Sequence, residues 1–451
     1  MIKQSVVAIF DIGKTNKKLL LFDNELNICY EEESSFTEIE DDDGFPCDDI
    51  EGIETWISDK CKKLVDHDAY TLKGINFTTY GATLVYLDKT GNRLTPLYNY
   101  LKPLDEAIPL KIYNEFGGKE EFCRRTASPD LRMLNSGFQA LWLKLNKPGI
   151  YSKVEVILHF PQYLSYFLTG RLSAEHTSIG CHTALWDFDT MDYHKWTTNL
   201  EVRLPAPVAI EKTFQAEAFN SPVPVGIGIH DSSASLVPYL MSSQKEFILI
   251  STGTWCISMN PFNNEPLSAE ELNKDCLQYL SIYQKPVKSS RFFLGRIHDV
   301  NVERLSSLYQ TNKNAYKEAG LIETLLKKLL TQNKELVFFA AGIPEKLVDT
   351  SVPIEQFASF TEAYHQLMID LTKLTAASIR LVISSEDHTR NLFITGGFTK
   401  NAIFIRLLKM FFPDKDIIIS EISNATSLGA AMVLWKSLNQ DLNVNLSLTR
   451  Y

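Results

Sequence analysis

Residues 6–23 read VVAIFDIGKTNKKLLLFD, which is an apolar run, a polar turn and a second apolar run. The two runs predict strands, and the Gly, Thr and Asn residues between them predict a tight turn. The same pattern returns in residues 246–259, where EFILI leads through STGTW to CISM. Turns rich in Gly and hydroxyl side chains present N–H and O–H donors on a concave face, which suits phosphate oxygens. Two such turns in one chain predict two related domains that hold one polyphosphate.

A P-loop is the competing interpretation of the first turn. Residues 8–15, AIFDIGKT, match a relaxed P-loop pattern in which Ala8 replaces the first Gly. A P-loop requires a strand, a loop and then a helix after its Lys-Thr pair. The segment after this turn instead reads as a strand that ends at Asp23. A hairpin is therefore predicted, with a P-loop NTPase and a plain hairpin without a ligand as alternatives.

The composition excludes several classes of protein. The 451 residues are 45% apolar and 22% charged, which is typical of a globular protein with a large core. The net charge of −10 argues against nucleic acid as a partner, because binding to phosphate backbones requires a basic face. The seven cysteines form no CxxC pair, which predicts reduced thiols and a cytoplasmic protein. No run reaches 18 apolar residues, so no membrane span is expected.

Strands and helices alternate twice along the chain. Before residue 201 we expect an edge strand over 28–38, a helix over 50–65, a strand, turn and strand over 74–88, and helices near 134–146 and 161–169. After it we expect a strand over 223–229, a helix from Ser232, a hairpin over 247–260, helices over 302–331, 355–385, 400–412 and 425–437, and strands at 392–396 and 416–420. A proline-rich segment, 201–224, predicts the boundary between domains 1–222 and 223–451. The expected fold is α/β, with two domains and a cleft between them.

Two carboxylates stand where phosphate chemistry would use them. Asp11 ends the first strand beside the phosphate turn, a position that suits Mg²⁺ held through water, although a turn-forming Asp is the alternative. Asp231 follows an apolar strand and opens a helix that begins SSASL. It can serve as an ordinary N-cap, and the helix dipole also keeps a carboxylate there ionised and ready to accept a hydroxyl proton. Phosphoryl transfer requires little beyond such a base, positioning and charge neutralisation.

These segments, in this order, resemble the FGGY carbohydrate kinases. The segments that carry the resemblance are DIGKTNKK (11–18), GIHDSSAS (228–235), STGTW (251–255), ITGGFTKN (394–401) and ATSLGAA (425–431). The resemblance implies two actin-like (ribonuclease H-like) ATPase domains, with ATP and Mg²⁺ bound in the cleft beside a small-molecule sugar. It leaves a homodimer open as the assembly.

The resemblance also implies a role for each matching residue. Asp231 would be the general base that deprotonates a sugar hydroxyl, and Asp11 would hold Mg²⁺ through water. The implied contacts are Gly13, Thr15, Asn16, Lys18, Thr252, Gly253 and Thr254 for the ATP phosphates, Gly396, Gly397 and Asn401 for adenosine, and Tyr80, Gly81, Ala82, Thr83, His230 and Asp231 for the sugar.

Two features bear on the substrate. Trp255 and the segment RFFLG (291–295) resemble the rhamnulose and fuculose kinase branch, and Thr83 stands where relatives often carry an acid. The resemblance therefore implies transfer to O1 of L-rhamnulose or L-fuculose, with D-xylulose, ribulose or another polyol as the alternative. In the alternative interpretation, Trp255 only packs beneath the phosphate turn and has no bearing on the substrate. A hypothesis of another class is a non-catalytic, ATP-gated sugar-binding regulator, which would need no base at Asp231.

Overall fold

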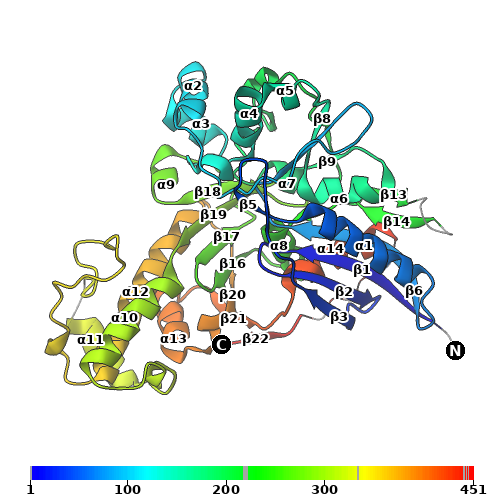
Figure 1. Cartoon of the computed structure of the whole chain (residues 1–451). Helices are drawn as coiled ribbons and strands as arrows, with labels where there is room; N and C mark the ends of the chain where they lie inside the picture. Colours follow the sequence, from blue (N-terminus) through cyan, green and yellow to red (C-terminus); the bar gives the residue numbers. More distant parts are fainter. Residues whose placement is uncertain (1–2, 217–221, 333–334, 440–441, 443, 445) are drawn as a thin grey trace.

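The computed structural model describes residues 3–216, 222–332, 335–439, 442, 444 and 446–451 (Figure 1). The first of two large sheets has the strand order β13-β14-β6-β1-β2-β3, with β15 also pairing with β6. Its strands are β1 (Gln4–Ile12), β2 (Lys17–Asp23), β3 (Ile28–Ser34), β6 (Tyr70–Thr79), β13 (Thr213–Ala216), β14 (Val223–Gly226) and β15 (Ile229–His230). β1, β2 and β3 are antiparallel, and β6 runs parallel to β1.

The second large sheet has the order β18-β19-β17-β16-β20-β21-β22. Its strands are β16 (Phe247–Thr252), β17 (Cys256–Asn260), β18 (Cys276–Leu280), β19 (Pro286–Phe292), β20 (Asn391–Gly396), β21 (Asp416–Ser420) and β22 (Leu448–Arg450). Strand β17 lies between β19 and β16 and is antiparallel to both. On the other side of β16, β20 and β21 run parallel to it. The two sheets therefore share one plan, as the repeated sequence pattern predicts.

The two hairpins are closed in the same way. The N–H of Gly13 donates to the carbonyl of Asn16 at 2.9 Å, and the N–H of Gly253 donates to the carbonyl of Trp255 at 2.9 Å. Because the strand β2 follows the first turn, the hairpin prediction is confirmed and the strand–loop–helix of a P-loop is excluded.

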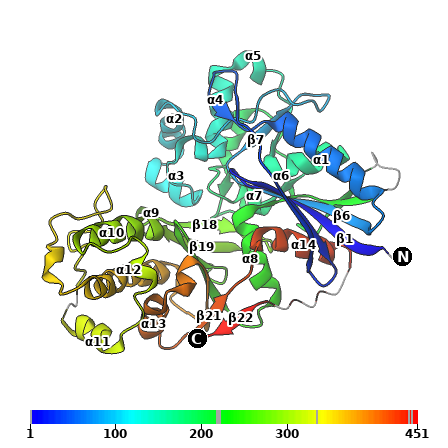
Figure 2. The same ribbon diagram turned by 60° about the horizontal axis from the view of Figure 1, so that its bottom comes forward.

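Helices cover both faces of the first sheet (Figures 1 and 2). Alternate residues of a strand point to opposite faces. Val6, Ala8 and Phe10 of β1 therefore pack against α1 (Ile50–Val65) and α6 (Phe160–Thr169), and Val7 and Ile9 pack against α8 (Asp231–Ser242) and α14 (Ala425–Ser437). The apolar pattern of β1 thus fixes which helices lie on which side.

Helix α8 also joins the two halves of the molecule. Ala234 and Val237 pack under the first sheet, whereas Leu236 and Tyr239 pack with Phe247 and Leu249 of the second. On its other face the second sheet is covered by α10 (Leu294–Leu308), α12 (Phe360–Val382) and α13 (Ala402–Phe411). The first residue of α8 is therefore held at the junction of the two sheets.

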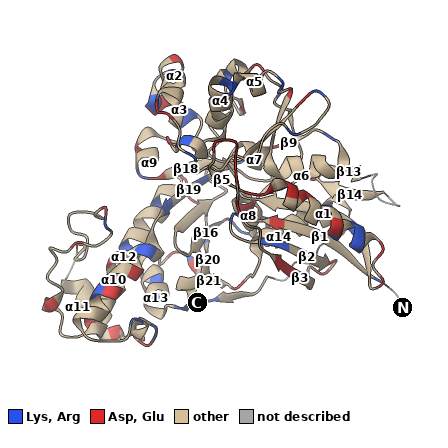
Figure 3. Cartoon of the chain, viewed as in Figure 1, with Lys and Arg blue, Asp and Glu red and all other residues tan. Residues whose placement is uncertain are grey.

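The remaining elements are mostly short and lie between or beside the two sheets. They are β4 (Ile39–Glu40), β5 (Pro46–Cys47), β7 (Leu84–Leu87), α2 (Ala107–Glu115), α3 (Lys119–Arg125), α4 (Ser136–Asn146), α5 (Pro148–Tyr151), β8 (Val156–His159), β9 (Ala174–Glu175), α7 (His176–Ile179), β10 (Trp186–Asp187), β11 (Asp192–Tyr193), β12 (Pro207–Val208), α9 (Ala269–Asn273) and α11 (Glu323–Gln332). Basic and acidic side chains are interspersed along α1, α10 and α12 (Figure 3), so the charge of these helices is mixed.

The prediction of one helix over 302–331 is wrong. The structure has α10, which begins at Leu294, and then α11, separated by the segment 309–322. That segment contains Asn312, Asn314 and Gly320, which favour turns over helix. The edge strand predicted over 28–38 is also shorter, because β3 ends at Ser34.

Two predicted strands pair differently from the simplest expectation. β7 pairs with β8 and not with β6, so residues 74–88 do not form a hairpin. The strand predicted over 223–229 is divided into β14 and β15, and both pair with β6 of the first sheet. Strands from both sides of the predicted 222/223 boundary thus build that sheet, and the boundary itself stays a prediction.

Candidate active site

Asp231 is the first residue of α8 and follows directly on β15. Its Oδ1 accepts a hydrogen bond from the Ser232 N–H at 2.5 Å and lies 3.3 Å from Nε2 of His230. The helix begins one residue earlier than the N-cap alternative requires, since His230 and not Asp231 occupies the N-cap position, yet the carboxylate still bonds to the first turn. Burial raises the pKa of Asp231 to about 6, and the hydrogen bonds from Ser232 oppose this. One third of the side chain is exposed, so a substrate hydroxyl can reach it.

Three histidines lie in this region: His230 beside Asp231, and His159 and His182 next to His230. Burial lowers the pKa of His230 to about 4, and the pKa values of His159 and His182 to about 3. The rings of His182 and His230 lie 6.5 Å apart between centroids. These imidazoles are neutral at neutral pH, so they can exchange hydrogen bonds with hydroxyl groups without adding charge. Sequence analysis missed His159 and His182, because long-range packing brings them here.

The turn over residues 80–83 lies against His230. A Cβ atom on Gly81 would lie 2.9 Å from Nε2 of His230 and 3.1 Å from Sγ of Cys181, so only glycine allows this approach. Tyr80, Gly81, Ala82 and Thr83 line a small space together with His159, Pro161, Ser178 and His230. The Tyr80 hydroxyl is directed away and donates to Oδ2 of Asp48 at 2.7 Å. The structure thus brings the predicted sugar-binding residues together with Asp231.

Asp11 faces Asp231 from the end of β1. Its Oδ2 accepts a hydrogen bond from the hydroxyl of Ser427 on α14 at 2.6 Å. Burial raises the pKa of Asp11 to about 6; the Ser427 hydrogen bond lowers it, the charge of Asp231 raises it and Lys18 lowers it. Within the described residues Oδ1 of Asp11 accepts no hydrogen bond from another side chain. A free carboxylate oxygen opposite a second carboxylate is a donor set that fits Mg²⁺.

The lysines of the first phosphate turn are already paired. Lys14 and Lys17 each donate to Asp48 at 2.7 Å. Lys18, a predicted phosphate contact, donates to Glu31 at 3.0 Å and to Oδ1 of Asn424 at 3.2 Å. Thr15 and Asn16 are exposed, whereas the N–H of Gly13 closes the turn.

The second phosphate turn opens into a pocket of about 510 Å³. Gly253 and Thr254 line it together with Gly397 and Asn401, two of the predicted adenosine contacts. Further lining residues come from the start of α10 and from the segment 316–320. The amide of Asn401 caps α13, since its Oδ1 accepts from the N–H groups of Ile403 and Phe404.

Thr252 and Gly396 support this turn from within. The buried hydroxyl of Thr252 donates to the carbonyl of Thr395 at 2.6 Å and accepts from the Phe398 N–H at 3.2 Å. Gly396 has φ 91°, and a Cβ there would lie 1.7 Å from the Thr252 carbonyl oxygen. Both residues therefore hold β16 against β20, and their predicted contacts with the nucleotide stay predictions.

Trp255 projects from the turn. It is 41% exposed and stacks on Phe293 with a centroid distance of 4.4 Å. The Arg291 guanidinium lies 5.4 Å from the centroid of the same ring.

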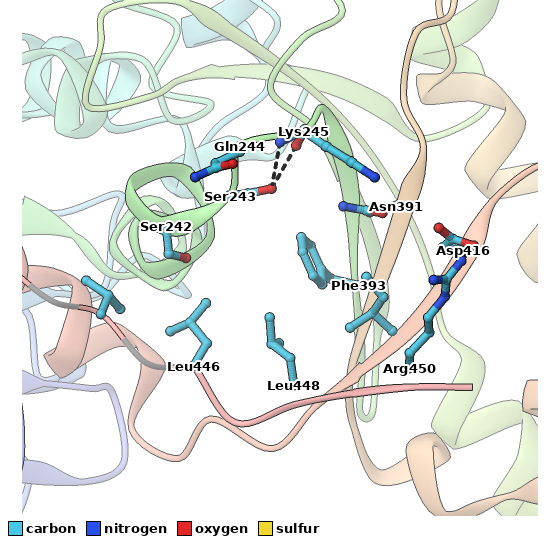
Figure 4. A pocket seen from close by; sticks show the side chains of 12 residues that line it. Ser242, Ser243, Gln244, Lys245, Asn391, Phe393, Asp416, Leu446, Leu448 and Arg450 are labelled. Carbon is cyan, nitrogen blue, oxygen red and sulfur yellow. Dashed lines mark hydrogen bonds and ion pairs between the residues drawn. The ribbon is translucent and has the colours of Figure 1, made fainter.

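A separate hollow of about 450 Å³ lies at the end of α8 beside β20, β21 and β22 (Figure 4). Arg450 in its wall is ion-paired with Asp416 at 2.5 Å, and the Ser243 hydroxyl donates to the Lys245 carbonyl. It contains none of the predicted site residues, so the candidate active site is the region around Asp231.

Comparisons with known proteins agree with this geometry. Residues 6–202 match the N-terminal domain of the FGGY family of carbohydrate kinases, and residues 244–442 match the C-terminal domain of carbohydrate kinase FGGY. Over 262 residues the chain is 26% identical to a rhamnulokinase from Mannheimia succiniciproducens, covering 56% of this chain and 52% of that protein. The chain spans about half the length of the curated relatives it matches.

Solved structures show the same fold. A carbohydrate kinase from Novosphingobium aromaticivorans has a TM-score of 0.81 at 22% identity, covering 100% of this chain and 94% of that chain. A ligand-bound xylulose kinase from Lactobacillus acidophilus has a TM-score of 0.76 at 15% identity, covering 99% and 93%. Among the described residues, the helices are too short or too polar to cross a membrane.

Proposed function

Because the chain belongs to the FGGY family of carbohydrate kinases, we propose that it transfers the terminal phosphoryl group of ATP to a hydroxyl group of a sugar. One observation carries the proposal: a partly exposed carboxylate, Asp231, stands at the junction of the two sheets and faces Asp11. The turn over residues 80–83 lies on one side of it. The pocket of the second phosphate turn belongs to the second sheet.

The acceptor sugar lies beside Tyr80–Thr83 and His230 in this proposal, and the neutral histidines orient its hydroxyl groups. The acceptor oxygen attacks the γ-phosphorus while Asp231 takes the hydroxyl proton. A bond forms between the sugar oxygen and phosphorus, the bond from phosphorus to the β–γ bridging oxygen breaks, and ADP leaves.

The nucleotide lies in the pocket of about 510 Å³, with its phosphates against the turn formed by Gly253 and Thr254. The remaining predicted phosphate contacts, Gly13, Thr15, Asn16 and Lys18, approach from the first turn. Asp11 would hold Mg²⁺, which when bound neutralises phosphate charge. Residues 1–222 and 223–451 are proposed as the two domains that meet around these ligands.

For the sugar we propose L-rhamnulose or L-fuculose, phosphorylated at O1. The rhamnulokinase relative and the exposed Trp255 support this choice. Buried Thr83 supplies no charge, so the wall that it forms suits the methyl end of a 6-deoxy sugar. An apolar pocket discriminates by only about 1–3 kcal/mol per methyl-sized group, so weaker activity on D-xylulose or ribulose is expected.

The test is an ADP-release assay of the purified protein against ketoses and polyols, with Asp231→Asn as the matched variant. Asn keeps an oxygen for the Ser232 N–H but cannot take a proton, so kcat should fall by about 10²–10⁴-fold while ATP binding is retained. Turnover of the variant within tenfold of the parent would overturn the role of Asp231.

Two other outcomes separate the alternatives. Specificity constants that are higher for glycerol, gluconate or D-xylulose than for both deoxy sugars would contradict the proposed substrate but not the proposed kinase activity. Sugar-dependent ATP binding without any ADP release would instead support a non-catalytic, ATP-gated regulator.

A further inference from the structure

Arg291 lies near the end of β19, beside the second phosphate turn. Its backbone pairs with Ile257 of β17, the strand that leaves this turn. Its Nε donates to Oδ1 of Asp275 at 3.1 Å, and its guanidinium covers one face of Trp255. The other contacts of that ring include Phe293. An ion pair and an aromatic stack together hold the guanidinium in a defined orientation.

Strand β19, which carries Arg291, is linked to the acceptor side of the site through its neighbour β18. The neighbouring strand β18 packs against the segment that carries His182, since a Cβ on Gly180 would lie 2.5 Å from Cγ of Leu280. Burial lowers the pKa of His182, and the nearby positive charge of Arg291 lowers it further. The ring of His182 lies edge-on to that of His230, and Nε2 of His230 lies 3.3 Å from Oδ1 of Asp231. Arg291 of the second sheet therefore lies on the side of the site where His182 and His230 neighbour Asp231.

The terminal nitrogens of Arg291 are unused. Within the described part of the chain, neither Nη atom donates a hydrogen bond to a protein group, and only Nε is occupied. By contrast, the lysines of the first phosphate turn are paired with Asp48 and Glu31. A guanidinium presents two parallel N–H donors that match the oxygens of a phosphoryl group.

We propose that Arg291 contacts the phosphoryl group as it passes from ATP to the acceptor, with Asp275 and Trp255 as the residues that position it. The inference rests on the proposed function. Charge is spread over the three equatorial oxygens of the transferring group, and a fixed guanidinium beside them stabilises that charge. Arg291 remains protonated throughout, since the only proton that moves goes to Asp231.

The experiment compares Arg291→Ala and Arg291→Lys with Arg171→Ala, a control that removes an exposed arginine just after α6, outside the candidate site. We expect Arg291→Ala to lower kcat by about 10²-fold or more, within the range of other phosphoryl-stabilising arginines. The Lys variant should recover part of the loss, and KM for the sugar and the affinity for ADP should change by less than about threefold. Arg171→Ala should keep kcat within about threefold of the parent, because Arg171 is exposed and lies outside the candidate site.

A binding readout separates a direct contact from a structural role. In the wild type, ADP with aluminium fluoride and sugar mimics the transferring group and should bind more tightly than ADP with sugar. Arg291→Ala should abolish that difference. A raised KM for the sugar at unchanged kcat would show that Arg291 binds the sugar. A loss of affinity that is the same for ADP with sugar and for ADP with aluminium fluoride and sugar would show a structural role. Either result overturns the inference.

Failure of the proposed function has a different signature. If the wild type phosphorylates no sugar in the panel, the function and the inference fall together. If the wild type is active and Arg291→Ala keeps kcat within threefold, the function stands and only the assignment of Arg291 is overturned.

Discussion

Asp11 and Asp231 show what a local motif can and cannot specify. Each follows an apolar strand and precedes a turn or helix, so its identity as a candidate was predictable from the sequence. Their effect on each other was not predictable, because it depends on two strands from distant parts of the chain ending at the same place. The positions of His159, His182 and Arg291 were not predictable for the same reason.

The raised pKa of Asp231 predicts opposite effects of pH on activity and stability. A base with a pKa of about 6 is ionised above that pH, so kcat/KM should fall as the pH decreases through about 6. The folded-state pKa exceeds the ordinary aspartate value of 3.8, so the folded state binds the proton more tightly, and the ionised carboxylate costs stability above pH 6.

Asp231→Asn should therefore raise the free energy of unfolding at pH 7.5 by about 1–2 kcal/mol, after allowing for the exposed third of the side chain. The gain should disappear near pH 4, where Asp231 is protonated in the folded state. Urea unfolding at both pH values measures this, and Asp59→Asn on the exposed side of α1 is the control. Equal free energies of unfolding for variant and parent at pH 7.5 would show that burial of the ionised carboxylate does not destabilise the folded state.

Among the elements, those with strong local signals were predicted well. Helix α14 matches the predicted 425–437, and both hairpins were predicted, because periodicity and turn residues specify them locally. The pairing of β14 and β15 with β6 is a contact between residues about 150 positions apart, and no local pattern encodes it. The break between α10 and α11 coincides with Asn and Gly residues, but the long polar stretch around them resembles the exposed face of a helix in the sequence.

The end of β20 provides a paired test of its two glycines. Gly396→Ala would force a Cβ against the Thr252 carbonyl at a φ of 91°, so the free energy of unfolding should fall by about 2 kcal/mol or more. A Cβ on Gly397 would meet open space, so Gly397→Ala should change stability by less than about 0.5 kcal/mol. Denaturant unfolding of both variants decides this. Equal stabilities would mean that the close contact between β16 and β20 relaxes without cost.

At the scale of the whole molecule, the proposed function assigns the two ligands to different halves. The predicted sugar turn belongs to the first sheet, the nucleotide pocket belongs to the second, and α8 packs on both. If the halves close around both ligands, each ligand should strengthen binding of the other by the same factor.

Calorimetry of a non-hydrolysable ATP analogue should therefore show about 5- to 150-fold tighter binding in the presence of a sugar that the enzyme phosphorylates. A sugar that is not phosphorylated is the control and should leave the affinity unchanged. Identical affinity with and without the substrate sugar would contradict closure as the link between the sites.

The packing of α14 has a consequence for biosynthesis. Its residues 430–435 cover the face of the first sheet formed by Val7, Ile9, Leu20 and Phe22, and Asn76 donates to the Ala430 carbonyl. Helix α8 follows β15 at once and covers part of this face, but the part that α14 covers must stay open while about 200 further residues are translated. At about 5–20 residues per second this takes about 10–40 s, during which the exposed face is open to chaperones and to aggregation.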